Sequence, residues 1–142
     1  MGYDDEKRSM GQDAAKKILV VDDDATNRLV VRVLMERRGY VVIEAPSGQE
    51  ALDIPDLNGC DIILMDLSMP RMDGFETTKR MREENKISQS TPIFALTAHN
   101  ARQNMELCLD SGMNGILTKP FDSHRADQLL SLISSSTGDL PA

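Results

Sequence analysis

The chain has 142 residues, of which 40% are hydrophobic, so it can form one compact domain with a buried core. Its formal net charge of -7 argues against nucleic acid as a direct partner, because contacts to phosphates need a basic surface. No segment approaches the ~20 apolar residues of a membrane span, and residues 1–15 lack the apolar core of a signal peptide. Cys60 and Cys108 have no Cys-x-x-Cys spacing, which is typical of reduced thiols. We therefore expect a soluble, cytoplasmic protein that makes no membrane contact of its own.

Residues 1–14 are polar and lack hydrophobic periodicity, so we expect a disordered leader or linker there. A single domain over residues 15–135 should follow, and residues 136–142 should form a flexible tail. Short runs rich in Ile, Val and Leu predict five buried strands in the domain. These runs lie at 18–21, 41–45, 62–65, 93–96 and 115–117.

The segments between and after the predicted strands show the apolar spacing of helices. The second helix, at 48–54, should be short because Pro55 ends it. Gly39 and Gly112 follow the first and fourth helices in the position of C-caps. The apolar side of each longer helix is marked by Leu29, Val30, Val33 and Leu34 in the first, Phe75, Thr78 and Met81 in the third, Met105, Cys108 and Leu109 in the fourth, and Leu129, Leu130, Leu132 and Ile133 in the fifth.

Five strands that alternate with five helices predict an α/β fold, with right-handed crossovers and a parallel sheet covered on both faces. In such sheets, functional groups gather beyond the carboxyl ends of the strands, near the point where the strand order reverses. The residues at those ends are Asp22, Asp23, Asp66, Thr97 and Lys119. Three carboxylates, a hydroxyl and an ammonium group should therefore converge on one edge of the sheet.

Three neighbouring carboxylates need a compensating cation. Two carboxylates about 4 Å apart repel by roughly 4 kcal/mol at an effective dielectric constant of about 20. A hard divalent ion with oxygen ligands relieves this repulsion, and Mg²⁺ is favoured over Ca²⁺ because so few protein ligands leave positions for water and phosphate oxygens. No His or Cys lies at this edge, which argues against zinc.

Lys119 and Thr97 suit a phosphoryl group that sits beside this metal. A metal and an ammonium group neutralise a transferring phosphoryl group, while a hydroxyl donates a hydrogen bond to one of its oxygens. A carboxylate that acts as the nucleophile would become an acyl phosphate. Asp66 is the best candidate because it follows its strand alone, whereas Asp22 and Asp23 arrive as a pair that suits a metal.

Other polar residues have structural interpretations. Asp24, together with Thr26, should cap the first helix, and Asp73 should form the turn that starts the third. His99 and His124 are expected to be exposed loop or helix residues.

Four motifs together resemble a known family, the receiver domain of response regulators in two-component and phosphorelay systems. They are "ILVVDDDATNR", "DIILMDLSMPRMDG", "FALTAHN" and "GILTKPF", in the family's order and approximate spacing over residues 16–135. The phrases "LTAHN" and "SGMNGILTKP" are most similar to receivers of hybrid sensor histidine kinases. The resemblance implies a flavodoxin-like (βα)5 fold, doubly wound, with strand order 2-1-3-4-5.

The resemblance also implies that Asp66 accepts a phosphoryl group from a phosphohistidine in a Mg²⁺-dependent reaction, with Mn²⁺ as an alternative ion. The implied metal ligands are Asp23 and Asp66 by side chain, Ser68 by its backbone carbonyl, and Asp22 mainly through a water. The groups implied to contact the phosphoryl oxygens are Thr97, Lys119 and the backbone amides of Leu67 and Ala98. The Lys119–Pro120 peptide bond is expected to be cis.

In one position the chain departs from the family pattern. Members often have Tyr or Phe three residues before the lysine, where the ring swings inward as the threonine moves, but this position is Ile116 here. An aromatic readout of phosphorylation is therefore excluded, although the Thr97 half of the switch can remain. Pro55 in the second helix is also unusual and indicates a short or bent helix.

The partner implied by the resemblance is a histidine kinase or a histidine-phosphotransfer domain. A phosphotransfer helix bundle would dock on the first helix and on the loop around Pro120 and Phe121. Phosphorylation would shift the conformation of the domain or pass the phosphoryl group on to this partner. The chain is expected to be a monomer or weak dimer that supports its own phosphorylation and dephosphorylation, and both a stand-alone protein and a fragment of a hybrid kinase remain open.

Two other classes of protein fit this sequence less well, one an enzyme and the other a binding module. A haloacid-dehalogenase-like phosphatase would use Asp22, Asp24 and Thr26 of "ILVVDDDAT", but it needs an acidic pair after a further strand beyond Lys119, and it leaves Asp66 without a role. A flavin-binding module would need a Ser/Thr/Gly-rich anion loop after the first strand, where three aspartates would repel a phosphate.

Overall fold

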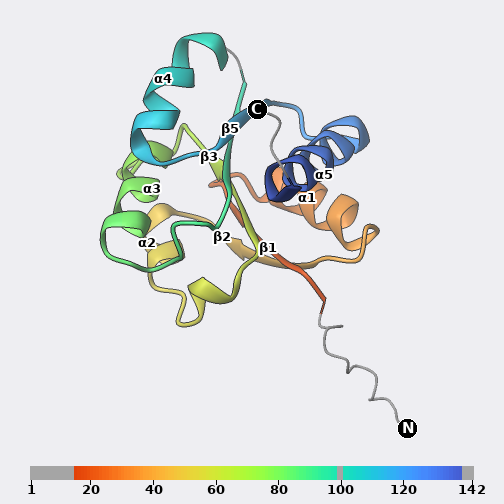
Figure 1. The fold of residues 1–142 in the computed structure, drawn as a ribbon, viewed down its shortest axis with the longest axis horizontal. Coiled ribbons are helices and arrows are strands. Elements are labelled where there is room, and N and C mark those ends of the chain that lie inside the picture. The colour runs from red at the N-terminus through yellow and green to blue at the C-terminus, as the bar shows by residue number, and fades with distance from the viewer. Residues whose placement is uncertain (1–14, 99–100, 139–142) are drawn as a thin grey trace, which may run out of the picture.

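The computed structural model describes residues 15–98 and 101–138, so the expected leader, His99 and the end of the expected tail lie outside it. Within the described residues, five strands alternate with five α-helices (Figure 1). The strands are β1 (Lys17–Val21), β2 (Val41–Ala45), β3 (Ile62–Asp66), β4 (Ile93–Thr97) and β5 (Gly115–Thr118). The helices are α1 (Ala25–Glu36), α2 (Gly48–Leu52), α3 (Gly74–Glu83), α4 (Ala101–Ser111) and α5 (Ser123–Gly138), with a 3-10 turn, η2 (Leu57–Gly59), after α2.

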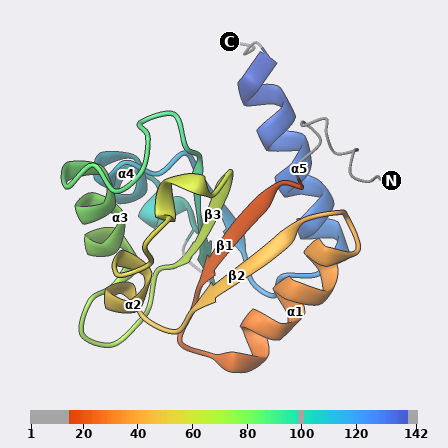
Figure 2. The same cartoon turned by 90° about the horizontal axis from the view of Figure 1, so that it is seen from below.

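The strands form a parallel sheet in the order β2-β1-β3-β4-β5, which confirms the expected topology. Helices α1 and α5 cover one face of the sheet, and α2, α3 and α4 cover the other (Figure 1 and Figure 2). Because the strands are parallel, their carboxyl ends lie at the same edge. The strand order reverses between β1 and β3, so the crevice of this doubly wound fold lies at the ends of these two strands.

The sheet supports a core on each face, because successive side chains of a strand point in opposite directions. Leu19 and Val21 of β1 belong to the core under α2, α3 and α4. Ile18 and Val20 belong to the core under α1 and α5. Every residue of β3 is buried, as expected for a central parallel strand, and this burial extends to its last residue, Asp66.

The element boundaries differ slightly from those predicted. Asp66 and Thr97 are the last residues of β3 and β4 rather than the first residues after them. Helix α2 ends at Leu52, two residues earlier than predicted, and Pro55 lies in the connection that follows. Helix α5 continues to Gly138, past residue 135, where we expected the domain to end.

Of the four apolar residues that mark α1 in the sequence, Leu34 packs against the core, but the other three are exposed. Leu29, Val30 and Val33 are 57%, 36% and 40% exposed, whereas Val31 and Met35 are fully buried. The spacing predicted the helix, but it is apolar on more than one side, and the spacing alone does not decide which side packs against β1 and β2. The predicted helix is therefore confirmed, while tertiary packing decides that these three residues are exposed.

Helix α4 shows the same effect more strongly. Cys108 is buried as predicted, but Met105 and Leu109 are 40% and 54% exposed. Of the three residues that mark α4 in the sequence, only Cys108 reaches the core. Among the described residues, no helix combines the length and the apolar composition that would let it cross a membrane.

Candidate functional site

The predicted carboxylates meet at the carboxyl ends of β1 and β3. Asp22, Asp23 and Asp66 each bring one carboxylate oxygen to within 4.8 Å of the others. Asp22 and Asp66 are buried, at 0% and 2% exposure, while Asp23 is exposed. The convergence expected from the strand ends is therefore present.

Lys119, one residue beyond β5, completes this cluster. Its Nζ lies 3.1 Å from Oδ1 of Asp66 and 3.7 Å from Oδ2 of Asp22. The preceding strand positions the lysine, and the peptide bond between Lys119 and Pro120 is cis, in agreement with the expectation. One ammonium group thus faces three carboxylates, so the cluster keeps an excess of negative charge that a cation would offset.

Hydrogen bonds and the close approach of α3 fix the position of Asp66. Its Oδ1 accepts a hydrogen bond from the backbone N–H of Ser68 at 3.3 Å as well as from Lys119. Helix α3 begins so close to it that a side chain on Gly74 would collide with the Asp66 carbonyl oxygen. Glycine at position 74 is therefore required for the approach of α3 to the end of β3.

The charges of this cluster shift the protonation equilibria of its members. Burial, followed by the nearby charge of Asp22, raises the pKa of Asp66 to about 6, although Lys119 opposes this change. The pKa of Lys119 is also raised: burial alone would lower it, but the carboxylates of Asp22 and Asp66 outweigh that effect. At neutral pH the lysine is charged and the Asp66 carboxyl is mostly ionised.

Asp22 is held from several sides. Its Oδ1 accepts a hydrogen bond from the Asp24 N–H at 2.9 Å, and its Oδ2 accepts one from Nδ2 of Asn27 at 3.3 Å. Its backbone carbonyl accepts a bond from Nη1 of Arg28 at 2.7 Å. The sequence interpretation missed both Asn27 and Arg28. Their position in the first turn of the helix after the aspartates was the available signal.

Asp24 takes the structural role predicted for it. It is the N-cap of α1, and its Oδ1 accepts hydrogen bonds from the N–H groups of Thr26 and Asn27 at 2.8 and 3.4 Å. Asp73 likewise caps α3 through the Glu76 N–H at 2.9 Å. Both predictions are confirmed, as is the exposure of His124.

The structure brings Thr97 to the same edge of the sheet, but it does not bring the Leu67 amide to the site. Thr97 is the last residue of β4 and is buried. The Leu67 N–H donates to the carbonyl of Leu96 at 3.2 Å, because the β3–β4 ladder continues one residue past Asp66. The N–H that reaches the Asp66 carboxylate is that of Ser68, for which only a role of the carbonyl was expected.

The remaining expected positions lie around this edge. Ala98 follows Thr97 and is exposed. Ile116 is half-buried and packs against the core under α2, α3 and α4. Pro120 is exposed, whereas Phe121 is only 7% exposed, so its ring does not offer the docking contact that was expected of it.

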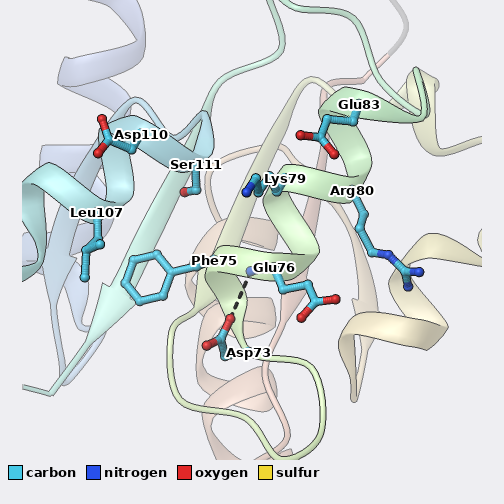
Figure 3. Close-up of a pocket in the computed structure, with 9 residues that line it drawn as sticks. All are labelled: Asp73, Phe75, Glu76, Lys79, Arg80, Glu83, Leu107, Asp110 and Ser111. Carbon is cyan, nitrogen blue, oxygen red and sulfur yellow. Dashed lines mark hydrogen bonds between the residues drawn. The ribbon is translucent and has the colours of Figure 1, made fainter.

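A cavity of about 550 Å³ lies between α3 and α4, apart from the carboxylate cluster. Figure 3 draws the residues that line it, among them Phe75 and Leu107. Acidic groups such as Glu76 and Asp110 and basic groups such as Lys79 line it together. None of the clustered carboxylates lines this cavity.

Comparison with known proteins gives a consistent assignment. A family model described as "Response regulator receiver domain" matches residues 18–131. The CAI-1 autoinducer sensor kinase/phosphatase CqsS of Vibrio cholerae is 36% identical over 107 residues, which is 75% of this chain and 16% of CqsS. The chain thus spans a small part of that relative.

Solved structures agree with this match. The receiver domain of sensor histidine kinase PA1611 from Pseudomonas aeruginosa PAO1, with magnesium in its active-site cleft, is 34% identical at a TM-score of 0.72, over 84% of this chain and 97% of that chain. A co-crystal structure of the Saccharomyces cerevisiae phosphotransfer protein Ypd1 and the receiver domain of Ssk1 matches at 30% identity and a TM-score of 0.73, over 82% and 87% of the two chains. With its strand order, its carboxylate cluster and its match over residues 18–131, this chain belongs to the response regulator receiver domain family.

Proposed function

We propose that this receiver domain accepts a phosphoryl group on Asp66 from a phosphohistidine, in a reaction that depends on Mg²⁺. The observation that carries the proposal is the buried Asp66 carboxylate, 3.1 Å from the Lys119 ammonium group and clustered with Asp22 and Asp23. A nucleophile, a cation and an acidic metal pocket are thereby combined at the end of one central strand.

The donor set fits Mg²⁺. It consists of carboxylate oxygens with an uncompensated negative charge, and Mg²⁺ prefers oxygen ligands and keeps several waters. In our proposal Asp23, Asp66 and the Ser68 carbonyl would ligate the ion directly, and Asp22 would act mainly through a water. The related PA1611 receiver holds magnesium in its active-site cleft, which supports this choice, and Mn²⁺ is an alternative hard cation. When bound, the ion supplies positive charge to the transferring phosphoryl group.

The side chains divide the work of the transfer. A carboxylate oxygen of Asp66 bonds to phosphorus while the bond from phosphorus to the donor imidazole nitrogen breaks, and the released histidine takes a proton from water. Lys119 and the Thr97 hydroxyl contact the phosphoryl oxygens, together with the N–H groups of Ser68 and Ala98. The pKa of about 6 leaves the Asp66 carboxylate ionised at neutral pH, while its burial keeps it poorly solvated and reactive.

The acyl phosphate would then bias a two-state equilibrium of the domain, by no more than it stabilises one state over the other. Ile116 stands where many relatives of this kind have an aromatic ring, so Thr97 and its neighbours must carry the readout without a ring that changes rotamer. Domain boundaries of 15–135 fit this role, and the domain would serve within a phosphorelay.

The phosphodonor proposed is a histidine-phosphotransfer protein or a histidine kinase that docks on α1. Leu29, Val30 and Val33 present apolar side chains there, with exposures of 57%, 36% and 40%. The similarity to a receiver domain crystallised with Ypd1 supports a helical phosphotransfer partner. The exposed Pro120 lies just beyond Lys119 and could extend the contact, while the buried Phe121 does not.

The direct experiment is incubation with Mg²⁺ and acetyl phosphate, followed by intact mass spectrometry. We expect the wild-type chain to gain one phosphoryl group, and Asp66→Asn or chelation of the metal to abolish the gain. Asp73→Asn is the matched control, because the same change is made on an exposed cap residue and asparagine is also a good N-cap. Phosphorylation of Asp66→Asn at the wild-type level would refute the assignment.

A further inference from the structure

We infer that Arg28 is a positioning residue of the metal site, because its guanidinium group holds the peptide between Asp22 and Asp23 while Glu44 holds the guanidinium. The inference rests on the proposed function of the site. It concerns a side chain in the first turns of α1 and one in β2, neither of which is a phosphoryl or metal contact.

The peptide after Asp22 has an unusual task. In a regular strand, consecutive side chains point to opposite faces. Here Asp22 and Asp23 are consecutive, yet each brings a carboxylate oxygen to the same cluster. The backbone must therefore depart from regular strand geometry between Asp22 and Asp23, just past the end of β1 at Val21. The orientation of the peptide that links the two aspartates then decides whether both carboxylates can reach one ion.

The two sides of Asp22 are held by different elements. Its N–H still donates to the Ala45 carbonyl of β2 at 3.1 Å, as a continuation of the sheet. Its carbonyl accepts the 2.7 Å bond from Nη1 of Arg28. A carbonyl of a buried residue needs a donor, and a charged donor at this distance makes a strong hydrogen bond. The guanidinium therefore fixes the plane of the peptide between the two metal-binding residues.

Glu44 keeps the guanidinium in this place. Nε of Arg28 donates to Oε1 of Glu44 at 2.9 Å, and the Arg28 side chain is only 16% exposed. Glu44 lies on the same side of β2 as Val42, whose side chain packs under α1 and α5. The alternation of the strand thus brings the Glu44 carboxylate to the side of the sheet that α1 covers, where it binds Arg28.

The surrounding charges are balanced. The second oxygen of Glu44 accepts from Nε of Arg32 at 2.7 Å, and Arg32 also pairs with Glu36 at 2.8 Å. Two guanidinium groups and two carboxylates form one network, so Arg28 can approach the metal loop without adding a net positive charge that would repel the ion. The network therefore holds the backbone at Asp22 and Asp23 in place and adds no attraction for the metal ion.

This arrangement makes a prediction whose sign is informative. The Arg28 guanidinium is positively charged and lies near the proposed Mg²⁺ site. If Arg28 were only an ion-pair partner of Glu44, its removal should leave Mg²⁺ binding unchanged or strengthen it, because one repulsive charge is lost. If it positions the Asp22–Asp23 peptide, its removal should weaken Mg²⁺ binding instead. The direction of the change separates the two roles.

The experiment is titration of the full chain with MgCl₂ by isothermal calorimetry. We expect Arg28→Ala to raise the Mg²⁺ dissociation constant by roughly tenfold, a typical loss when a group that orients metal ligands is removed. Arg32→Ala is the matched control: it deletes the same charge and another bond to Glu44, but Arg32 does not contact Asp22. We expect its dissociation constant to stay within about twofold of the wild type.

Arg28→Gln and Arg32→Gln form a second pair that keeps the aliphatic part of each side chain, and circular dichroism verifies that each variant is folded. In ¹⁵N NMR spectra of the metal-free chain, we expect the amide resonances of Asp23 and Asp24 to shift in the Arg28 variants and not in the Arg32 variants. Equal Mg²⁺ affinities in the Arg28 and Arg32 variants, or tighter binding without Arg28, would overturn the inference. If the wild-type chain gained no phosphoryl group from acetyl phosphate, the proposed function would be refuted instead. A failure of the inference about Arg28 can therefore be distinguished from a failure of the proposed function.

Discussion

Helices α1 and α4 have similar lengths, 12 and 11 residues, and lie on opposite faces of the sheet, but they are attached to it very differently. Val31 and Met35 of α1 are fully buried, and its arginines bind Glu44 of β2. Among the described side chains of α4, only Cys108 and Ser111 are buried. Three of its apolar side chains, those of Met105, Leu107 and Leu109, are 40%, 55% and 54% exposed.

This difference in attachment indicates different roles for the two helices at the site. On the α1 side, hydrogen bonds from the first turn of the helix hold Asp22, so this part of the carboxylate cluster is fixed in place. On the α4 side, little buried area opposes a small displacement of the helix that follows Thr97. Elements with few buried contacts occupy the low end of local stability, and we expect α4 to be the element that responds to a phosphoryl group.

Two methionines test this difference most directly, because the same substitution can be made in each helix. Met35→Ala should lower the free energy of unfolding by about 2–5 kcal/mol, since it removes a fully buried side chain and leaves a cavity. Met105→Ala should cost less than about 1 kcal/mol, because the side chain is 40% exposed. Urea denaturation measures both, and equal losses would remove the proposed contrast between α1 and α4.

Ionisation of the buried Asp66 carboxyl should lower the stability of the folded protein, and this effect should depend on pH. In the metal-free protein the pKa of Asp66 is about 6, because of burial and then of the Asp22 charge, against about 3.9 in an unfolded chain. The protonated group therefore contributes stability that is fully present below about pH 4 and is lost as the pH rises through 6.

Asp66→Asn should consequently be more stable than the wild type at pH 8, by on the order of 2 kcal/mol, and this advantage should disappear toward pH 4. Urea denaturation in the presence of EDTA at several pH values checks the expectation. Saturating Mg²⁺ should reduce the advantage, because the ion stabilises the ionised carboxylates. An advantage that does not change with pH would show that the Asp66 charge is not its source.

Substitutions of the adjacent residues Asp23 and Asp24 test which carboxylate beside α1 binds the metal. Asp23→Ala should weaken Mg²⁺ binding by more than the roughly tenfold loss expected when a group that only orients ligands is removed, because Asp23 belongs to the carboxylate cluster. It should leave the folded state about as stable, because Asp23 is exposed. Asp24→Ala should leave Mg²⁺ binding nearly unchanged but cost about 1 kcal/mol of stability, because it removes the N-cap of α1. Calorimetry and urea denaturation separate the two effects, and equal losses of affinity would mean that the wrong carboxylate has been assigned to the metal.

The smallest effect concerns two exposed leucines, Leu29 of α1 and Leu107 of α4, which are 57% and 55% exposed. Changing either one to serine should alter stability by no more than about 0.5 kcal/mol. Leu29→Ser should slow phosphotransfer from a phosphorylated histidine-phosphotransfer protein by about 3- to 10-fold, as expected for an apolar docking contact. Leu107→Ser should transfer at the wild-type rate. Equal rates for both variants would argue against docking on α1.

Local patterns were enough to predict the order of the elements and much of the site. Apolar runs bounded by polar residues defined the strands, and parallel strands bring their carboxyl ends together, so Asp22, Asp23, Asp66 and Lys119 could be placed at one edge. Asp24 could be read as a cap because capping depends on residues two and three positions away. Each of these inferences uses a rule that acts within one element or applies to every parallel sheet.

The tertiary structure alone decided which groups complete the site. The side of α1 that is buried depends on how the helix packs against the sheet, and the Leu67 amide was diverted because the ladder with β4 continues to Leu96. The contact of Arg28 with Glu44 joins residues of α1 and β2, and neither residue indicates the other. Such contacts depend on the register and angle of packed elements, which the whole core determines, whereas the sequence by itself determined the strands, the caps and the acidic edge on which those contacts act.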